Sequence, residues 1–194
     1  MKVLLLDADG VVLNKGEYFS ERFSREHNVP IEDVLQFFKG PFVLCQKGEA
    51  DLKKELKPYL KKWNWSGTVE DFLDYWFSSD VILHADIEST VSQFKNMGIK
   101  CYLASNNEAY RAEAISNVLN KENLLDGSYF SAYLKVRKEN PGFFKHVLND
   151  IAVEPSEVVF VDNDQKNVDS AISVGIKAYL YEPGILNRLL KTQN

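Results

Sequence analysis

Short runs of consecutive apolar residues recur along the chain, at residues 3–6, 101–104, 158–161 and 178–180. A strand of a parallel sheet is covered by helices on both faces, so it reads as a continuous apolar run instead of alternating with polar residues. These runs have the length of strands and are too short for helices. The pattern therefore predicts the buried strands of a parallel sheet.

Stretches with helical spacing lie between these runs. In residues 86–97, Ile87, Val91 and Phe94 follow one another at intervals of four and three, and Gly98 ends the stretch. Similar stretches occur at residues 108–119, 142–151 and 166–174. This alternation predicts an α/β fold with a Rossmann-like, doubly wound parallel sheet in three layers, α/β/α.

Residues 15–83 break the alternation, because they contain helix-like stretches without a convincing strand between them. We expect helices near residues 17–27, 31–38, 50–62 and 69–78, separated by loop-forming sequences such as KGP at 39–41. The chain is thus expected to have an α/β core, residues 1–14 and 84–194, into which an all-helical cap, residues 15–83, is inserted. Aromatic residues of the cap, among them Trp63, Phe72 and Trp76, are typical of a core but could also form a ligand-binding surface.

Polar residues follow three of the predicted strands. Asp7 and Asp9 follow the first, Ser105, Asn106 and Asn107 the second, and Asp162, Asn163 and Asp164 the third. Lys138 lies in a polar stretch before a predicted helix. Ligands of open parallel sheets bind beyond the carboxyl ends of the strands, so we expect these side chains to gather there. Each has a structural alternative, since Asp-Gly is a turn dipeptide and Asn106, Asn107 and Asp164 can cap helices.

The residue types fit phosphoryl transfer through an aspartyl-phosphate. This reaction needs a carboxylate nucleophile, a second carboxyl group for proton transfer, and a divalent cation to screen negative charge. Asp7 and Asp9 fit the first two roles, because residues two apart in an extended chain lie on the same side, about 6.6 Å apart. Ser105, Asn106, Lys138 and the backbone near Gly10 are the candidate phosphate-binding groups, and Mg²⁺ is the expected ion.

The sequences LLLDADGVVL, LASNN, RKENPGFF and VVFVDNDQKNVDSA resemble, in order and context, the four motifs of the haloacid dehalogenase-like hydrolase superfamily. The predicted helical cap also resembles that family's small cap. The resemblance implies Asp7 as nucleophile and Asp9 as general acid/base, with Ser105 and Lys138 on the phosphoryl group. It further implies that Asp7, the Asp9 carbonyl and the Asp162 region, including Asn163, bind Mg²⁺.

Two positions depart from the family pattern. Asn163 replaces the second of two adjacent acids, so the metal site carries less negative charge, and Asp162 or Asp164 could take over. Glu139 stands where proline usually follows the lysine, which makes Lys135 the alternative to Lys138.

Asp9 favours phosphate esters over carbon–halogen bonds, because a halide leaving group needs no proton donor. We therefore expect a phosphatase that acts on a small phosphorylated metabolite. A phosphomutase uses the same acids, and a binding or regulatory protein with weakened catalysis is a further alternative.

Composition narrows the expected setting of the protein. The net charge of −5 argues against broad attraction to nucleic acid or anionic membranes. Cys45 and Cys101 form no C-x-x-C pair, and Cys101 is expected to be buried. No apolar run has the length of a membrane span or a signal sequence, so we expect a cytoplasmic protein.

Overall fold

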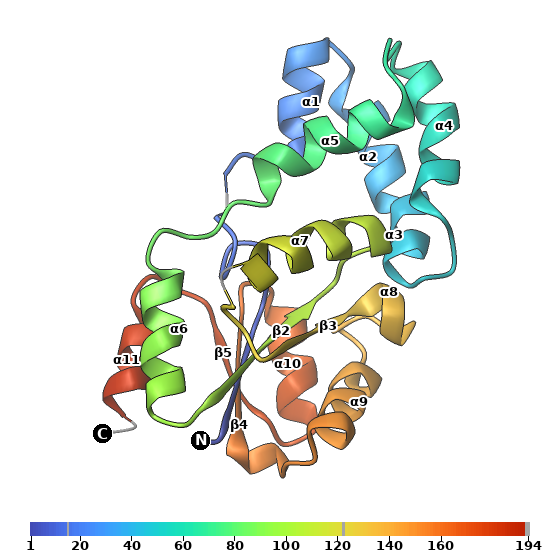
Figure 1. The fold of residues 1–194 in the computed structure, drawn as a ribbon. Coiled ribbons are helices and arrows are strands. Elements are labelled where there is room, and N and C mark those ends of the chain that lie inside the picture. The colour runs from blue at the N-terminus through green and yellow to red at the C-terminus, as the bar shows by residue number, and fades with distance from the viewer. Residues whose placement is uncertain (15, 122, 193–194) are drawn as a thin grey trace.

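The computed structural model describes residues 1–14, 16–121 and 123–192, and it contains a five-stranded sheet (Figure 1). All neighbouring strands are parallel, and their order is β3-β2-β1-β4-β5. The strands are β1 (Val3–Leu6), β2 (Lys100–Ser105), β3 (Gly127–Phe130), β4 (Val158–Asp162) and β5 (Lys177–Leu180). The four strands predicted from apolar runs are therefore confirmed, and β3 is an additional one.

Helices cover both faces of the sheet, because successive residues of a strand point to opposite sides. Leu4 and Leu6 pack with buried residues of α6, α7 and α11, whereas Val3 and Leu5 pack with α9 and α10. These helices are α6 (Ile87–Asn96), α7 (Ala109–Lys121), α9 (Pro141–Ile151), α10 (Gln165–Ser173) and α11 (Ile185–Lys191). The predicted three-layer, Rossmann-like α/β/α fold is confirmed.

In the described part of the chain between β1 and α6 there are five helices, and Figure 1 shows most of them grouped beyond one end of the sheet. We call residues Phe19–Asp80 the helical insertion. Its buried side chains form their own hydrophobic cluster, which includes Phe23, Trp63 and Phe72. The predicted start of the cap at residue 15 lies outside the described residues. The helices are α1 (Phe19–His27), α2 (Ile31–Lys39), α3 (Pro41–Gln46), α4 (Leu52–Lys62) and α5 (Val69–Asp80).

Helix α3 corrects the expectation of a simple loop at residues 39–41. Pro41 occupies the first turn of α3, where its missing N–H costs no intrahelical hydrogen bond and its fixed φ suits the helix. Two further short elements are α8 (Ser131–Leu134) and a 3₁₀ turn at Pro155–Glu157.

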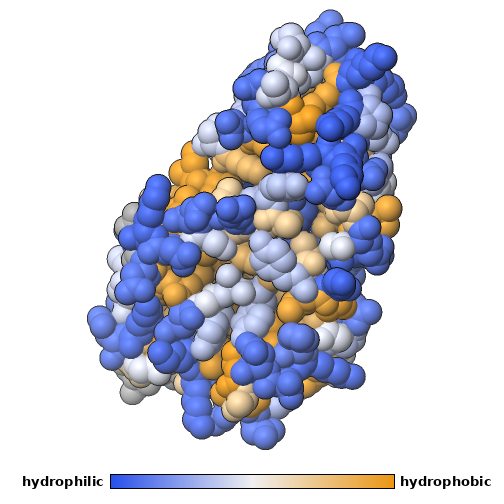
Figure 2. Space-filling view, turned by 45° about the vertical axis from the view of Figure 1, so that its right-hand side comes forward, coloured by the Kyte–Doolittle hydropathy of each residue, from blue (hydrophilic) through white to orange (hydrophobic). Residues whose placement is uncertain are grey.

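The surface mixes polar and apolar residues. On the face drawn in Figure 2, apolar residues reach the surface in several patches separated by hydrophilic ones. Within the described residues, no helix has both the length and the apolarity needed to cross a membrane. Cys101 is buried, as expected, and so is Cys45.

Candidate active site

The carboxyl ends of three neighbouring strands bring the predicted site residues together. Asp7 directly follows β1, Ser105 ends β2 and Asp162 ends β4, and β1 lies between the other two strands. The chain builds the sheet outward from β1 to β3 and then returns to place β4 on the other side of β1. Open α/β sheets bind ligands at such a reversal of strand order, so this edge is the expected position of an active site.

A buried lysine joins two of the carboxylates. Lys138 Nζ donates hydrogen bonds to Asp7 Oδ1 and, at 2.6 Å, to Asp162 Oδ2. The side chains of Lys138, Asp7 and Asp162 are only 2%, 7% and 1% exposed. Asp162 also accepts hydrogen bonds from Asn167 Nδ2 and from the Asp164 N–H. Buried charges need such pairing, and here every charge has a hydrogen-bonded partner of opposite sign.

The loop that carries Lys138 is fixed by a side chain from another strand end. Asn106 Oδ1 accepts a hydrogen bond of 2.8 Å from the Lys138 N–H. After Lys138 the chain enters α9, where the Asn140 side chain caps the helix. Lys135, the alternative suggested by the sequence, is exposed. The structure thus brings Lys138, and not Lys135, to Asp7.

Asp9 lies in a different environment from Asp7. The Arg111 guanidinium donates to both of its carboxylate oxygens, at 2.8 and 2.6 Å, and Asn107 Nδ2 donates at 3.2 Å. Arg111 comes from α7 and its side chain is 6% exposed, whereas that of Asp9 is 51% exposed. A charge-assisted pair in fork geometry fixes both the position and the orientation of a carboxylate.

Arg111 is a functional candidate that the sequence did not place at the site, and Asn107 was expected at this strand end without a specific role. The signal for Arg111 lies in its helix: Ala112 and Ile115 are buried core residues of α7, and Arg111 shares their face at helical spacing. A charged residue on a core-facing stripe needs a buried partner, which indicates a site and not a solvated surface.

Burial and neighbouring charges shift the pKa values of Asp7, Asp9 and Lys138 in different directions. Burial raises the pKa of Asp7 to about 7, and the like charges of Asp162 and Asp9 add to this effect against the opposing charge of Lys138. Burial also opposes ionisation of Asp9, but Arg111 outweighs it and holds the pKa of Asp9 below its usual range. Burial would lower the pKa of Lys138, but the carboxylates of Asp7 and Asp162 outweigh it and raise that pKa.

The oxygen atoms at this edge fit a hard divalent cation. Within the described residues, no three carboxylate, imidazole or thiol side chains cluster closely enough to hold a metal ion alone. The oxygens implied by the family resemblance are those of Asp7, the Asp9 carbonyl, Asp162 and Asn163. The Asp162 carboxylate is already bonded to Lys138, Asn167 and the Asp164 N–H, and Asn163 Nδ2 donates a hydrogen bond of 2.6 Å to the Asp9 carbonyl. The two ends of an amide occupy nearly equal space, so a turned Asn163 side chain presents its oxygen. Mg²⁺ commonly takes few protein oxygens and keeps several waters, so the donor set suits it.

The predicted phosphate-binding groups lie at the same edge of the sheet, and some of them already form hydrogen bonds within the protein. Ser105 Oγ accepts a hydrogen bond from Asn107 Nδ2 at 2.7 Å, which leaves its own proton available. Gly10, at φ 89°, turns the chain, and its N–H donates to the Leu13 carbonyl. By contrast, the N–H groups of Ala8 and Asp9 have no acceptor in the described part of the chain. Such free donors suit an anion.

Comparison with known proteins agrees with this combination of fold and site. The sequence model of a hydrolase family, haloacid dehalogenase-like hydrolase, matches residues 1–175. The chain therefore belongs to the haloacid dehalogenase-like hydrolases, as its motifs suggested.

Two curated relatives from fungi match a part of the chain. Over 92 residues, 47% of this chain, it is 30% identical to sesquiterpene phosphatase astK of Aspergillus oryzae. Over a stretch of the same length it is 33% identical to drimenol cyclase drtB of Aspergillus calidoustus. The matched stretch spans 47% of the first relative and 17% of the second, so it covers less than half of either protein.

Solved structures share the fold over almost the whole chain. A haloacid dehalogenase family enzyme from Bacteroides thetaiotaomicron superposes with a TM-score of 0.78 at 20% identity, covering 95% of both chains. Another structure of that enzyme, a complex with magnesium and inorganic phosphate, gives a TM-score of 0.77 at 21% identity, covering 95% of this chain and 96% of that one. At this level of identity, the likeness establishes the fold.

Proposed function

We propose that this chain is a Mg²⁺-dependent phosphatase that cleaves a small organic phosphate monoester through an aspartyl-phosphate on Asp7. The observation that carries the proposal is the placement of two carboxylates, Asp7 and Asp9, at one strand end in different environments. The Asp7 carboxylate is buried and forms an ion pair with Lys138, whereas the Asp9 carboxylate is half exposed and forms an ion pair with Arg111. The charge of Lys138 favours the ionised, nucleophilic form of Asp7, and the exposure of Asp9 lets it exchange protons with the leaving group and with water. The phosphatase name of one relative and the magnesium and phosphate in a structural neighbour support the same chemistry.

The first step of the proposed reaction transfers the phosphoryl group to the protein. The Asp7 carboxylate attacks phosphorus, the bond between phosphorus and the ester oxygen breaks, and protonated Asp9 gives its proton to the departing alcohol. Arg111 favours the ionised form of Asp9. The acid role therefore requires this pair to loosen when the ester binds, and the negatively charged phosphoryl group is a competing partner for the guanidinium.

The second step releases inorganic phosphate. Ionised Asp9 accepts a proton from a water molecule, which attacks the phosphorus of the aspartyl-phosphate and frees the Asp7 carboxylate. The N–H groups of Ala8 and Asp9, the Ser105 hydroxyl and Lys138 are the donors available to the phosphoryl oxygens in both steps. A bound Mg²⁺, held by Asp7, the Asp9 carbonyl and Asn163, would screen the negative charge gathered at this edge.

Hydrolysis of p-nitrophenyl phosphate, measured with Mg²⁺ and with a chelator, tests the proposal. The parent is expected to turn over only with Mg²⁺, and Asp7→Asn to lose at least about a thousandfold in kcat because it removes the nucleophile. Asp169→Asn, the same change on the exposed surface of α10, is the matched control and is expected to stay within twofold of the parent. If the parent shows no metal-dependent turnover of any ester in a broad panel, the phosphatase proposal is wrong.

A further inference from the structure

A cavity of about 450 Å³ lies between the strand ends and the helical insertion. Asp9, Gly10 and Asn163 line it on the side of the sheet, and residues of α1, α2, α3 and α5 line it on the opposite side. Its volume is within the range of about 300–1,000 Å³ that is usual for small-molecule sites. A phosphoryl group at Asp7 and Asp9 would therefore have its organic part directed into this cavity.

Four aromatic rings of the helical insertion line the far side of the cavity; we call Phe19, Phe38, Phe42 and Trp76 the aromatic wall. The ring centroids of the three phenylalanines lie 4.9, 5.2 and 5.4 Å, respectively, from that of Trp76. Three of the residues are buried and Phe38 is half-buried, so the rings are held by one another and by the core of the insertion. They form a fixed surface that a ligand meets without ordering mobile side chains.

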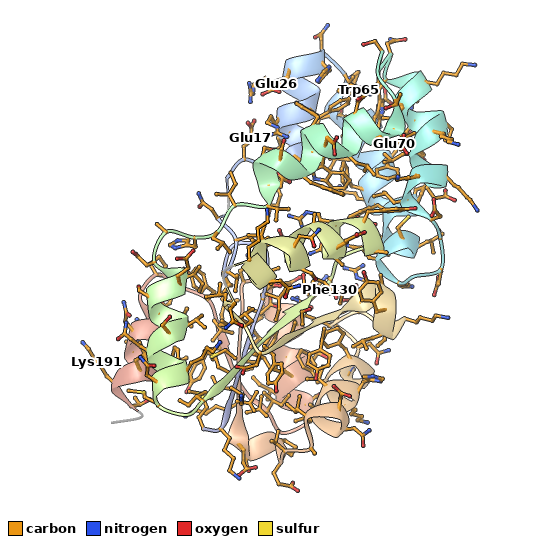
Figure 3. The ribbon with its side chains drawn as sticks, viewed as in Figure 1. Glu17, Glu26, Trp65, Glu70, Phe130 and Lys191 are labelled. Atoms are coloured by element: carbon orange, nitrogen blue, oxygen red, sulfur yellow. The ribbon has the colours of Figure 1, made fainter. Side chains whose placement is uncertain are left out.

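Some polar groups beside the aromatic wall have partners within the protein, whereas Arg22 Nε is buried without one among the described residues. The Trp76 indole N–H donates to Asp80 at 3.0 Å, so this ring offers the cavity only apolar surface. Arg22 lies over the Phe19 and Tyr75 rings and donates to a backbone carbonyl. Glu17, labelled in Figure 3 at the side of the helical insertion, pairs with Arg25 at 2.6 Å. The rings therefore offer the cavity apolar surface, and Arg22, Ser20 and Ser79 are polar side chains in the same lining.

We propose that the aromatic wall binds the hydrocarbon body of the substrate, so that the substrate is the phosphate monoester of an apolar alcohol. This inference rests on the proposed phosphatase function. The ester oxygen lies near Asp9, and the carbon chain extends along Phe38, Phe42 and Trp76. Affinity for the organic part then comes from burial of apolar surface, which increases with the number of carbon atoms.

Straight-chain alkyl phosphates from ethyl to octyl, kept below micellar concentrations and assayed with Mg²⁺, test the inference. The value of kcat/KM is expected to rise about two- to fourfold for each added methylene until the cavity is filled. Octyl phosphate is expected to exceed glycerol phosphate and glucose phosphate by at least about tenfold. A flat series, or a preference for the polar esters, would overturn the inference and leave the phosphatase proposal intact.

A binding measurement separates failure of the inference from failure of the catalytic proposal. Calorimetry with Asp7→Asn and Mg²⁺ is expected to show octyl phosphate binding at least about tenfold more tightly than ethyl phosphate. If no ester is hydrolysed but this preference is found, the phosphatase proposal fails and the apolar site stands. Equal affinities would overturn the apolar site whatever the activity.

A matched pair of variants tests whether the preference for longer alkyl chains depends on the aromatic wall. Phe38 and Phe77 are both half-buried and both contact Trp76, but only Phe38 lines the cavity. Phe38→Ala is expected to lower the ratio of kcat/KM for octyl over ethyl phosphate by about tenfold, and Phe77→Ala to leave that ratio unchanged. An equal change of the ratio in both variants would show that the rings act only through the packing of the insertion, which contradicts the inference. The alkyl series on the parent decides the question if Phe38→Ala does not fold.

Discussion

Replacing Lys138 by methionine removes the positive charge that lies between the Asp7 and Asp162 carboxylates. All three side chains are nearly inaccessible to solvent, so water cannot take the place of the lost charge. Removing one partner of a buried ion pair costs about 3–5 kcal/mol, because the remaining charge is buried without compensation. Asp162 keeps its hydrogen bonds from Asn167 and from the Asp164 N–H, so the loss falls mainly on Asp7.

Two features put the expected loss at the lower end of this range. Methionine has nearly the length of the apolar part of lysine, so the variant leaves little empty volume. Asp7 can also take up a proton, because its pKa is already raised to about 7 by burial and becomes higher without Lys138. We therefore expect the free energy of unfolding to fall by about 3 kcal/mol at pH 7.5, which lowers Tm by roughly 6–12 °C in a domain of this size.

Urea unfolding followed by circular dichroism, in the presence of a chelator, measures this loss. The chelator is needed because a divalent cation would screen the same carboxylates. Lys135→Met is the matched control: Lys135 is exposed, so its replacement is expected to change the free energy of unfolding by less than about 0.5 kcal/mol. A loss below about 1 kcal/mol in Lys138→Met, with an unchanged native spectrum, would refute the argument that Lys138 neutralises a buried acidic pair.

Three further predictions concern the neighbouring residues. Asn163→Asp adds a carboxylate beside the Asp9 carbonyl and is expected to lower the Mg²⁺ concentration that gives half-maximal activity; an unchanged requirement would mean that Asn163 is not a ligand. Arg111→Met frees Asp9 from its fixed orientation and is expected to lower kcat about 10- to 100-fold, as measured at saturating ester; an unchanged kcat would make the pair structural only. Burial raises the pKa of Glu108 to about 7, so the folded protein holds this proton more tightly than the unfolded chain and the free energy of unfolding decreases as pH rises from about 5 to 8. Glu108→Gln is expected to remove this contribution, on the order of 3 kcal/mol at most, and equal urea midpoint shifts between pH 5 and pH 8 in parent and variant would contradict it.

The parts of the fold that the sequence predicts are those with a continuous apolar pattern. Strands β1 and β4 are buried at every residue, so their apolar runs stand out. Strand β3, at one edge of the sheet, reads GSYF, has only Phe130 fully buried and presents no apolar run, unlike the other edge strand, β5, which reads KAYL. Such an edge strand is specified by its hydrogen bonds to β2 and not by its own pattern.

Some residues of the candidate site can likewise be predicted from the sequence, whereas others depend on tertiary packing. Asp7, Ser105 and Asp162 can be predicted to lie together because the carboxyl ends of parallel strands meet at one edge. The pairing of Arg111 with Asp9 depends on how α7 packs over the sheet, and that packing places residues 102 positions apart in contact. Similarly, Lys138 reaches Asp7 because Asn106 holds its loop. This contact joins two distant segments and cannot be predicted from the local sequence of either one.

The ion pair between Arg111 and Asp9 changes the net charge of the site, and with it the expected effect of having Asn163 instead of an acid. Taken from the sequence alone, Asn163 removes a negative charge from a metal site. In the structure, Asp7, Asp9 and Asp162 face the two cations Lys138 and Arg111, so one negative charge remains among these five side chains when all are ionised. An aspartate at position 163 would double that charge and would strengthen the attraction for Mg²⁺, but it would also repel the phosphate dianion that must approach the same edge. A neutral Asn163 therefore favours a site in which the phosphate contributes part of the negative charge that holds the cation. By thermodynamic linkage, Mg²⁺ and the ester then strengthen each other's binding.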